Sequence, residues 1–263
     1  MSQAMLKRWL TRRPRVTVDT ARVPNGLRVY AIGDIHGRAD LLRLLHRRVA
    51  ADAVNADPAT RKLAIYLGDY VDRGLHSREV IDVLLGEPLP GFDHIHLRGN
   101  HDHEFLAFLK DPERGAAWLR YGGDATVYSY GVRLAADTPA EERLVRLGER
   151  LREAVPPHHL EFLAGLPFTC EVGDYLFVHA GIDPDKALDQ QTPEDMLWIR
   201  DPFLEADCDF GKVVVHGHSV TEDPEVRENR IGIDTGACYT NALTCLVLQG
   251  NRYGFLSTRD ARP

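Results

Sequence analysis

The sequence predicts an α/β fold with a parallel sheet, because short apolar runs alternate with helical patterns in its first hundred residues. The runs 27–32, 62–67 and 92–97 are short and apolar, which is typical of buried strands. A leucine-rich stripe follows the first run and an apolar stripe follows the second, with Asp40 and Ser77 as the expected helix caps. This βαβαβ order predicts parallel strands joined by right-handed crossovers.

The second half of the chain changes from long helical patterns to short strands separated by turns. Helices are predicted over 101–109 and 141–155, with a shorter one ending near residue 166, whereas residues 121–131 fit no pattern. Another helix is predicted over 193–199. Strands are predicted over 168–172, 175–178, 213–215, 230–233, 243–248 and 252–256. We expect these strands to form a second sheet that packs on the first.

The composition is typical of a soluble enzyme with a sizeable core, since apolar residues make up 44% and charged residues 27% of the 263 positions. The net charge of −7 argues against nucleic-acid binding, which usually leaves a basic stripe. No apolar run approaches the ~18 residues that span a membrane, and the cysteines lack paired metal-ligand spacing. We therefore expect reduced thiols, a cytoplasmic location, no nucleic-acid partner and no membrane span.

Glycine-framed polar motifs follow several of the predicted strands. They are Gly-Asp-Ile-His-Gly at 33–37, Gly-Asp-Tyr-Val-Asp-Arg-Gly at 68–74, Gly-Asn-His-Asp at 99–102, Val-His-Ala-Gly at 178–181 and His-Gly-His at 216–218. Ligands of α/β sheets bind beyond the carboxyl ends of the strands, where the first three motifs fall. Together the motifs offer carboxylate, imidazole and amide groups, which suit two divalent ions.

The spacing of the polar residues suggests how they would share two ions. Asp34 and His36 stand two apart beyond one strand, so both can point to one side of the loop. Two ions about 3.5–4 Å apart repel each other strongly, and Asp69 at the neighbouring strand end is the natural bridging carboxylate. Asn100 and His179 would complete the shell of the second ion, together with one histidine of the last motif.

The last motif offers two histidines. His216 still belongs to the predicted strand 213–215, whereas His218 lies past Gly217 at the loop tip. We therefore expect His218 to be the ligand and His216 to be packed or to lie behind the ligands.

His101 is predicted to act as a general acid, because adjacent residues at a helix start diverge and its neighbour is the expected ligand. Asp72 is the candidate carboxylate behind it. A salt bridge between Asp72 and Arg73 is the alternative, and both contacts could form at once. Arg73 offers a planar fork of donors for phosphate oxygens. Arg200 is a second candidate clamp, with an ion pair to Asp201 as the alternative.

The motifs at 33–37, 68–74 and 99–102 resemble the signature set of the phosphoprotein phosphatase (PPP) family of calcineurin-like metallophosphoesterases, in its bacterial branch. The resemblance spans roughly residues 27–248. It implies a four-layer α/β/β/α sandwich, with two mixed sheets flanked by helices and a dimetal centre at the strand ends. It implies the metal ligands Asp34, His36, Asp69, Asn100, His179 and His218, the catalytic pair His101 and Asp72, and the phosphate contacts Arg73, Asn100 and Arg200.

In this interpretation residues 26–263 form a single metallophosphoesterase domain, and residues 1–25 form a basic N-terminal extension. The extension carries Lys7, Arg8, Arg12, Arg13 and Arg15, and no apolar stretch typical of a signal peptide follows them. We expect it to be solvated or loosely docked, and a helix that binds a membrane surface or a partner is the alternative.

The resemblance implies hydrolysis of a phosphomonoester by in-line attack of a metal-bridging hydroxide, with Mn²⁺ as the first choice of metal and Fe or Zn²⁺ as alternatives. The expected substrate is a phosphoprotein at serine or threonine, with dual specificity or a small phosphoester also open. A symmetrical dinucleoside-polyphosphate hydrolase is the first rival, although such relatives usually lack the aspartate found here at Asp72. A metal-free scaffold is the second rival. Asp102 stands where eukaryotic members usually carry glutamate.

Overall fold

A computed structural model describes residues 15–259, and its first sheet has the strand order β10-β9-β1-β2-β3. Its strands are β1 (Leu27–Ile32), β2 (Arg61–Tyr66), β3 (Phe92–His96), β9 (Thr244–Gln249) and β10 (Arg252–Ser257). The three N-terminal strands are parallel, as predicted. The prediction that the last two strands belong to the second sheet was wrong: β9 pairs antiparallel with β1, and β10 follows it as an edge hairpin. The sheet is therefore mixed.

The second sheet has the order β4-β5-β6-β8-β7. Its strands are β4 (Thr169–Val172), β5 (Tyr175–Val178), β6 (Val213–His216), β7 (Glu225–Val226) and β8 (Arg230–Gly232). The sequence patterns did not predict β7, which is only two residues long. The strands β5, β6 and β8 are parallel, so their carboxyl ends lie at one edge of this sheet.

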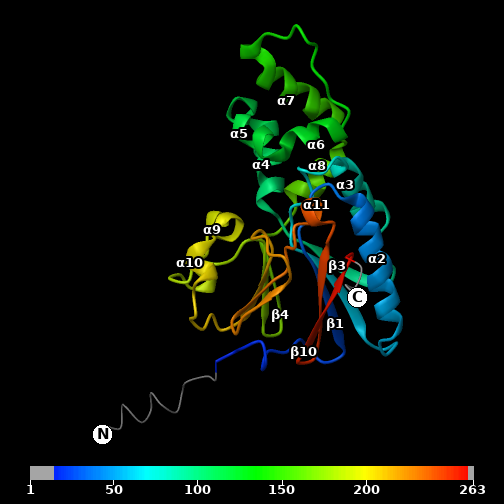
Figure 1. Cartoon of the computed structure of the whole chain (residues 1–263), viewed down its shortest axis with the longest axis vertical. Helices are drawn as coiled ribbons and strands as arrows, with labels where there is room; N and C mark the ends of the chain where they lie inside the picture. Colours follow the sequence, from blue (N-terminus) through cyan, green and yellow to red (C-terminus); the bar gives the residue numbers. More distant parts are fainter. Residues whose placement is uncertain (1–14, 260–263) are drawn as a thin grey trace.

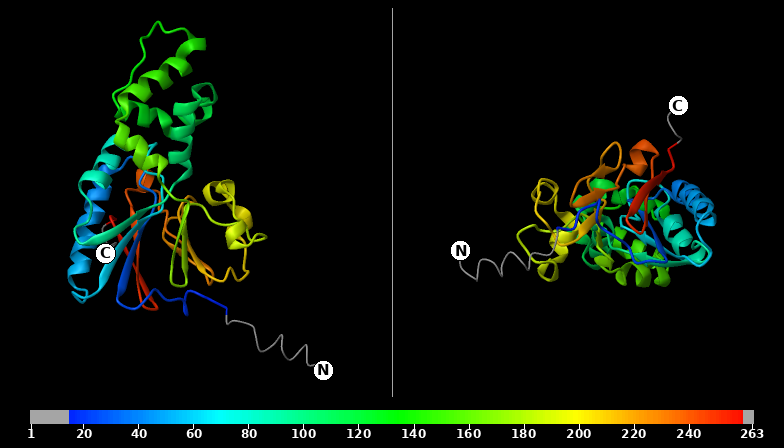
Figure 2. Two further views of the ribbon diagram at one scale, coloured as in Figure 1. Left: turned by 180° about the vertical axis from the view of Figure 1, so that it is seen from behind. Right: turned by 90° about the horizontal axis from the view of Figure 1, so that it is seen from below.

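Helices cover the outer faces of both sheets (Figure 1). The first sheet carries α2 (Ala39–Val54) and α3 (Ser77–Gly86), and the second carries α9 (Pro193–Trp198) and α10 (Asp201–Leu204). Apolar side chains fill the space between the sheets and the space under each helical layer. Two views confirm the predicted four-layer sandwich with two mixed sheets (Figure 2).

A group of helices extends the molecule beyond the strand ends (Figure 1). It contains α4 (Asn100–Lys110), α5 (Ala116–Trp118), α6 (Asp124–Ser129), α7 (Arg143–Ala154) and α8 (Pro157–Ala164). The unassigned stretch 121–131 contains the end of a π-helical turn, Leu119–Gly123, then α6 and the two residues that follow it. That turn contains Gly122 with a φ of 112°, which interrupts the helical period and explains the missing pattern.

Both predicted helix caps were wrong. Arg38 occupies the N-cap position of α2 without a capping side-chain hydrogen bond, and Asp40 lies inside the first turn, where it binds the Arg38 guanidinium at 2.8 Å. Ser77 is the first residue of α3 rather than its cap, and its hydroxyl accepts a hydrogen bond from the backbone N–H of Asp72 at 3.0 Å. Ser77 therefore holds a loop of the candidate site instead of a helix end.

The boundary predicted at residue 25 stays a prediction, and the basic residues Lys7 to Arg13 lie outside the described residues. Within the described part, Val18, Ala21 and Val23 are buried in the cluster between the sheets. No helix between residues 15 and 259 has the length and apolar content to cross a membrane.

Candidate metal centre

The loop after β1 brings Asp34 and His36 to the carboxyl ends of the strands, and both side chains are buried. His36 has a φ of 45°, and its Nδ1 is 2.9 Å from the carbonyl oxygen of Val71. This contact directs the other ring nitrogen, Nε2, toward Asp69 and Arg73. Gly217 lies so close that a Cβ there would stand 2.1 Å from Asp34 Oδ1, so glycine is needed at that position.

Asp69 lies between two groups of histidines. Its Oδ2 is 3.3 Å from His36 Nε2, and its Oδ1 is 3.5 Å from His179 Nε2. Burial opposes its charge, yet the surrounding histidines, with His179 first, hold the pKa of Asp69 below its ordinary value. Its carboxylate faces both groups, which is the position that a bridging ligand requires.

Asn100 opens α4 and contacts the second group of histidines. Its Oδ1 is 2.8 Å from His179 Nε2 and 2.9 Å from His218 Nδ1. The other nitrogen of His179 is 2.9 Å from the carbonyl oxygen of Leu67. His218 has a φ of 60°, and its backbone N–H donates to Asp34 Oδ2 at 3.0 Å, which links this motif to the loop after β1.

The donor set fits divalent ions. Ligand atoms of His36, Asp69 and His101 lie within 4.8 Å of one another, and so do those of Asp69, His179 and His218. Burial lowers the pKa of His36 to about 3 and also lowers that of His218, so both imidazoles are neutral and keep a lone pair. Among residues 15–259, Asp34 Oδ1 and His218 Nε2 are buried without a hydrogen-bond partner. Neutral imidazoles, an amide and carboxylates suit Mn²⁺, Fe or Zn²⁺ alike.

His101 is paired with Asp72 through a short hydrogen bond, in which His101 Nδ1 lies 2.7 Å from Asp72 Oδ2. Asp72 is fully buried and also accepts from Trp118 Nε1 at 2.7 Å and from Thr126 Oγ1 at 2.6 Å. Burial opposes the charge on His101, but Asp69 and the bond to Asp72 raise the pKa of this histidine above its ordinary value. In the described part of the chain Asp72 pairs with His101 and forms no ion pair with Arg73, which was the alternative partner.

Arg73 points into the same space. Its Nη1 is 2.8 Å from His36 Nε2, and its Nη2 is 3.0 Å from His101 Nε2. Arg200 lies next to the last motif, where its Nη1 donates to Ser219 Oγ at 3.4 Å. No ion pair joins Arg200 to Asp201 in the described part of the chain, so that alternative was wrong.

A family model described as calcineurin-like phosphoesterase matches residues 27–242. The chain belongs to this family. The match covers all five motifs, and the two buried histidine and aspartate groups agree with the dinuclear centre expected from the sequence. The protein is therefore a metal-dependent phosphoesterase.

Sequence relatives of this calcineurin-like phosphoesterase include two proteins named bis(5′-nucleosyl)-tetraphosphatase PrpE [asymmetrical]. The protein from Anoxybacillus flavithermus is 25% identical over 232 residues, which cover 82% of this chain and 88% of the relative. The protein from Bacillus subtilis is 26% identical over 233 residues, which cover 81% of this chain and 87% of the relative.

Solved structures support the fold. A putative diadenosine tetraphosphatase has a TM-score of 0.59 at 20% identity, over 92% of this chain and 100% of the other. A cold-active protein-tyrosine phosphatase of a psychrophilic Shewanella species also has a TM-score of 0.59, at 16% identity, over 90% and 83% of the two chains. At these identities the likeness shows the shared fold alone.

The structure brings together nine of the sequence-predicted site residues in one buried or half-buried group and places Arg200 at its edge. The nine are Asp34, His36, Asp69, Asp72, Arg73, Asn100, His101, His179 and His218. His216 instead packs edge-on against Phe203, with ring centroids 5.0 Å apart. This position agrees with the interpretation of His216 as a packed residue. The individual roles stay predictions that this proximity supports.

The sequence interpretation assigned no role to two buried carboxyl groups, Asp234 and Asp102. Asp234 follows β8 and lies near Asp34, where burial and the charge of Asp234 raise the pKa of Asp34. Asp102 accepts hydrogen bonds from the backbone N–H groups of Gly99, Asp69 and Tyr70 at 2.9 to 3.0 Å. The sequence did contain a signal for Asp234, since Ile-Asp-Thr-Gly repeats the pattern of a strand end followed by aspartate and glycine.

Proposed function

We propose that this calcineurin-like phosphoesterase is a phosphoprotein phosphatase that hydrolyses phosphoserine and phosphothreonine. Dual specificity, which adds phosphotyrosine, is compatible with the same site. The observation that carries the proposal is the buried pair of His101 and Asp72, 2.7 Å apart. An alkoxide is a poor leaving group, so its release needs a proton at the moment of bond cleavage. This pair supplies a suitable donor beside the candidate metal ligands.

Asp34, His36 and Asp69 would hold one ion, and Asp69, Asn100, His179 and His218 would hold the other. Two bound ions, with Mn²⁺ as the first choice and Fe or Zn²⁺ as alternatives, would neutralise phosphate charge and supply an activated water as the nucleophile. His36 Nε2 has one lone pair, which Arg73 uses in this structure. Metal binding at that atom would therefore release Nη1 of Arg73 for a phosphate oxygen.

His101 would act as the proton donor from Nε2, which faces the centre while Nδ1 is bound to Asp72. The carboxylate fixes the orientation of the ring and stabilises its protonated form. The donors Trp118 and Thr126 in turn stabilise the charge on Asp72. The proton lost from His101 goes to the leaving oxygen, and solvent restores it in the next turnover.

The phosphate contacts we propose are Arg73, Asn100 and Arg200. The Arg73 guanidinium presents a planar fork that matches two phosphate oxygens. The amide nitrogen of Asn100 remains available for a phosphate oxygen, because its Oδ1 atom takes both histidine contacts. Arg200 would approach from the side of His218, next to Ser219.

Hydrolysis of a dinucleoside tetraphosphate is the second candidate, because relatives that match 81–82% of this chain carry that activity in their names. Those names state asymmetrical cleavage, whereas the sequence analysis considered the symmetrical reaction as the rival. The two reactions differ in their products, since asymmetrical cleavage of diadenosine tetraphosphate gives ATP and AMP, and symmetrical cleavage gives two ADP. The presence of Asp72 favours the phosphatase. The cytoplasmic location stays an untested expectation.

The experiment compares turnover of p-nitrophenyl phosphate, a phosphothreonine peptide and diadenosine tetraphosphate by the Mn²⁺-loaded protein and by its His101→Asn variant. We expect rapid hydrolysis of the peptide and its loss in the variant. Preference for the dinucleotide would replace the proposed substrate with the second candidate, and the nucleotide products would identify the cleavage. A protein that binds two metal ions and hydrolyses none of the three would contradict the proposal.

A further inference from the structure

An exposed tyrosine lies beside the proposed phosphate-binding arginine. Tyr239 belongs to α11 (Ala237–Thr240), and 69% of its surface is exposed. The guanidinium carbon of Arg73 lies over the Tyr239 ring, 5.9 Å from its centroid. A large apolar ring left in contact with water next to a buried polar centre is a feature that the mechanism above does not use.

The backbone around Tyr239 forms a closed turn. Gly236 and Asn241, which flank α11, both have left-handed backbone conformations, with φ of 69° and 58°. The Thr240 hydroxyl donates to the carbonyl oxygen of Thr235 at 2.7 Å, which closes the turn on itself. A short turn closed in this way presents a ring at low entropic cost, because a tyrosine side chain has few rotatable bonds.

The ring also lies close to the expected leaving group. His101 Nε2, the proposed proton donor, is 3.0 Å from Arg73 Nη2, and the same guanidinium covers the Tyr239 ring. One guanidinium group therefore separates the proton donor from the aromatic surface. A group bonded directly to the leaving oxygen would reach that surface without a spacer.

We propose that Tyr239 is the stacking surface for a planar aromatic leaving group, so that the substrate class includes aryl phosphomonoesters such as phosphotyrosine. The inference rests on the proposed phosphomonoesterase function and specifies a class of leaving group that its site accepts. In an aryl ester the ring is bonded to the leaving oxygen itself. In a dinucleotide, ribose and further phosphates separate the base from the reacting phosphorus. An aromatic surface this close to the proton donor therefore suits the ring of an aryl ester better than the base of a dinucleotide. Offset stacking of two aromatic rings adds affinity beyond the area that it buries.

The experiment measures kcat and KM of the Mn²⁺-loaded full chain with an aryl pair, O-phosphotyrosine and p-nitrophenyl phosphate, and an alkyl pair, O-phosphoserine and β-glycerophosphate. Diadenosine tetraphosphate serves as the nucleoside arm. The variants are Tyr239→Leu, which removes the ring, and Tyr239→Phe, which keeps it.

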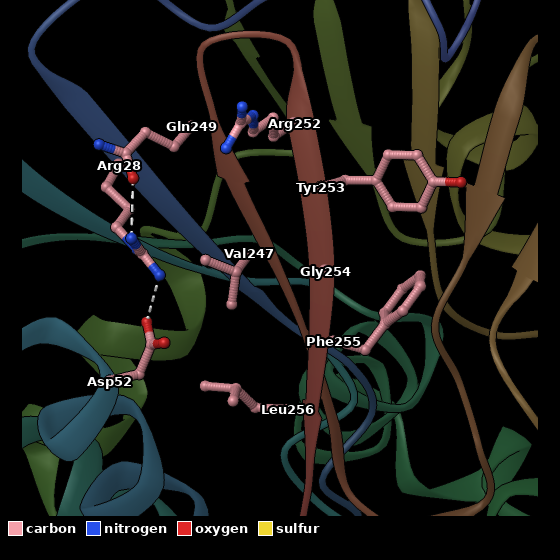
Figure 3. A pocket seen from close by; sticks show the side chains of 9 residues that line it. All are labelled: Arg28, Asp52, Val247, Gln249, Arg252, Tyr253, Gly254, Phe255 and Leu256. Carbon is pink, nitrogen blue, oxygen red and sulfur yellow. Dashed lines mark hydrogen bonds and ion pairs between the residues drawn. The ribbon is translucent and has the colours of Figure 1, made fainter. Parts of the chain in front are cut away.

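Tyr253→Ala is the matched control, because this exposed tyrosine lies at the other end of the first sheet. It faces Leu248 on β9, opposite the start of β1, and lines a separate pocket with Phe255 (Figure 3). We expect this variant to keep the kinetics of the unmodified chain with all substrates.

We expect Tyr239→Leu to raise KM about fivefold for the aryl pair, which corresponds to about 1 kcal/mol, and to leave KM for the alkyl pair within about twofold. Tyr239→Phe should keep the aryl preference. An equal loss for both pairs would overturn the inference and make Tyr239 a support for Arg73 alone. A loss confined to diadenosine tetraphosphate would assign the ring to a nucleobase instead. If the unmodified chain hydrolyses no monoester, the proposed function fails as well, whereas unchanged aryl preference in an active Tyr239→Leu variant refutes only this inference.

Discussion

The Asp72→Asn substitution would test the negative charge behind His101 separately from the hydrogen bonds that orient the His101 ring. The carboxylate accepts from His101 Nδ1 and Trp118 Nε1 on one oxygen and from Thr126 Oγ1 on the other. Asparagine can keep its oxygen toward His101 and Trp118 and turn its amide nitrogen toward Thr126. The Thr126 hydroxyl can then accept that hydrogen bond, because it can donate instead to Ser77 Oγ, 3.0 Å away. The substitution therefore removes a charge while the contacts survive.

The loss of this charge should weaken the proton donor and therefore depend on the leaving group. Asp69 and Asp72 raise the pKa of His101, so the variant should have a lower histidine pKa and less protonated imidazole at neutral pH. General acids contribute roughly 10²- to 10⁴-fold, so we expect kcat for a phosphothreonine peptide to fall about 100-fold, equivalent to about 2.7 kcal/mol. The nitrophenolate leaving group needs little protonation, so kcat for p-nitrophenyl phosphate should fall no more than about fivefold.

The assay is steady-state turnover of both substrates from pH 5 to 9, with thermal unfolding to verify that Asp72→Asn folds. An imidazolium with a lowered pKa loses its proton at a lower pH, so the alkaline limb of kcat for the peptide should move to lower pH. Asp93→Asn is the control, because Asp93 is exposed and pairs with Arg61 on the surface. An equal fall in kcat for both substrates, with the alkaline limb of the pH profile unshifted, would refute the role of Asp72 as the carboxylate that supports a proton donor.

Three further predictions follow from buried polar groups. Burial lowers the pKa of His46 to about 4, so just below the unfolded value of about 6.5 only the unfolded chain gains this proton. His46 should therefore contribute a loss of about 1.6 kcal/mol to the free energy of unfolding from pH 6.5 to 5, measured by urea titration, and His46→Asn should remove this contribution. Asp102→Ala deletes the acceptor of three backbone hydrogen bonds and should lower the free energy of unfolding by about 3 kcal/mol, measured by urea titration. A change within about 0.5 kcal/mol, the size expected of a neutral surface substitution, would contradict this. His218→Ala should lower the affinity for Mn²⁺, measured by calorimetry, about 10-fold or more. His216→Ala should lower the stability of the fold and keep both ions.

Local patterns were sufficient to predict most strands and helices, but strand partners depend on contacts that no local pattern contains. The runs 243–248 and 252–256 look like strands of the second sheet because they follow its other members along the chain. They join the first sheet because β9 pairs with β1, more than 200 residues away, from Arg28↔Gln249 to Ile32↔Cys245. The short strand β7 and the π-helical turn before α6 have too few residues to show a period.

The candidate site was more predictable than the fold around it, because its residues occupy glycine-framed strand ends. The residues that the sequence did not reveal come from other elements: Trp118 and Thr126 reach Asp72 from the helical group, and Asp234 comes from the end of β8. The local sequence around each of these residues contains no motif that distinguishes it from a structural residue. Only the packing of α5 and α6 against the loop 68–74 makes two of them partners of a buried carboxylate.

The loops of the two sheets hold one another through backbone hydrogen bonds, and this explains how separate motifs reach one place. The N–H of His36 donates to the carbonyl oxygen of Asp69 at 2.8 Å, which joins two loops of the first sheet. The N–H of Gly217 donates to the carbonyl oxygen of His179 at 2.8 Å, which joins two loops of the second. The N–H of His218 then donates to Asp34 across the sheets. Because the backbones position the side chains, a single ligand can be replaced without displacing the others, and substitutions at this centre should report on chemistry more than on folding.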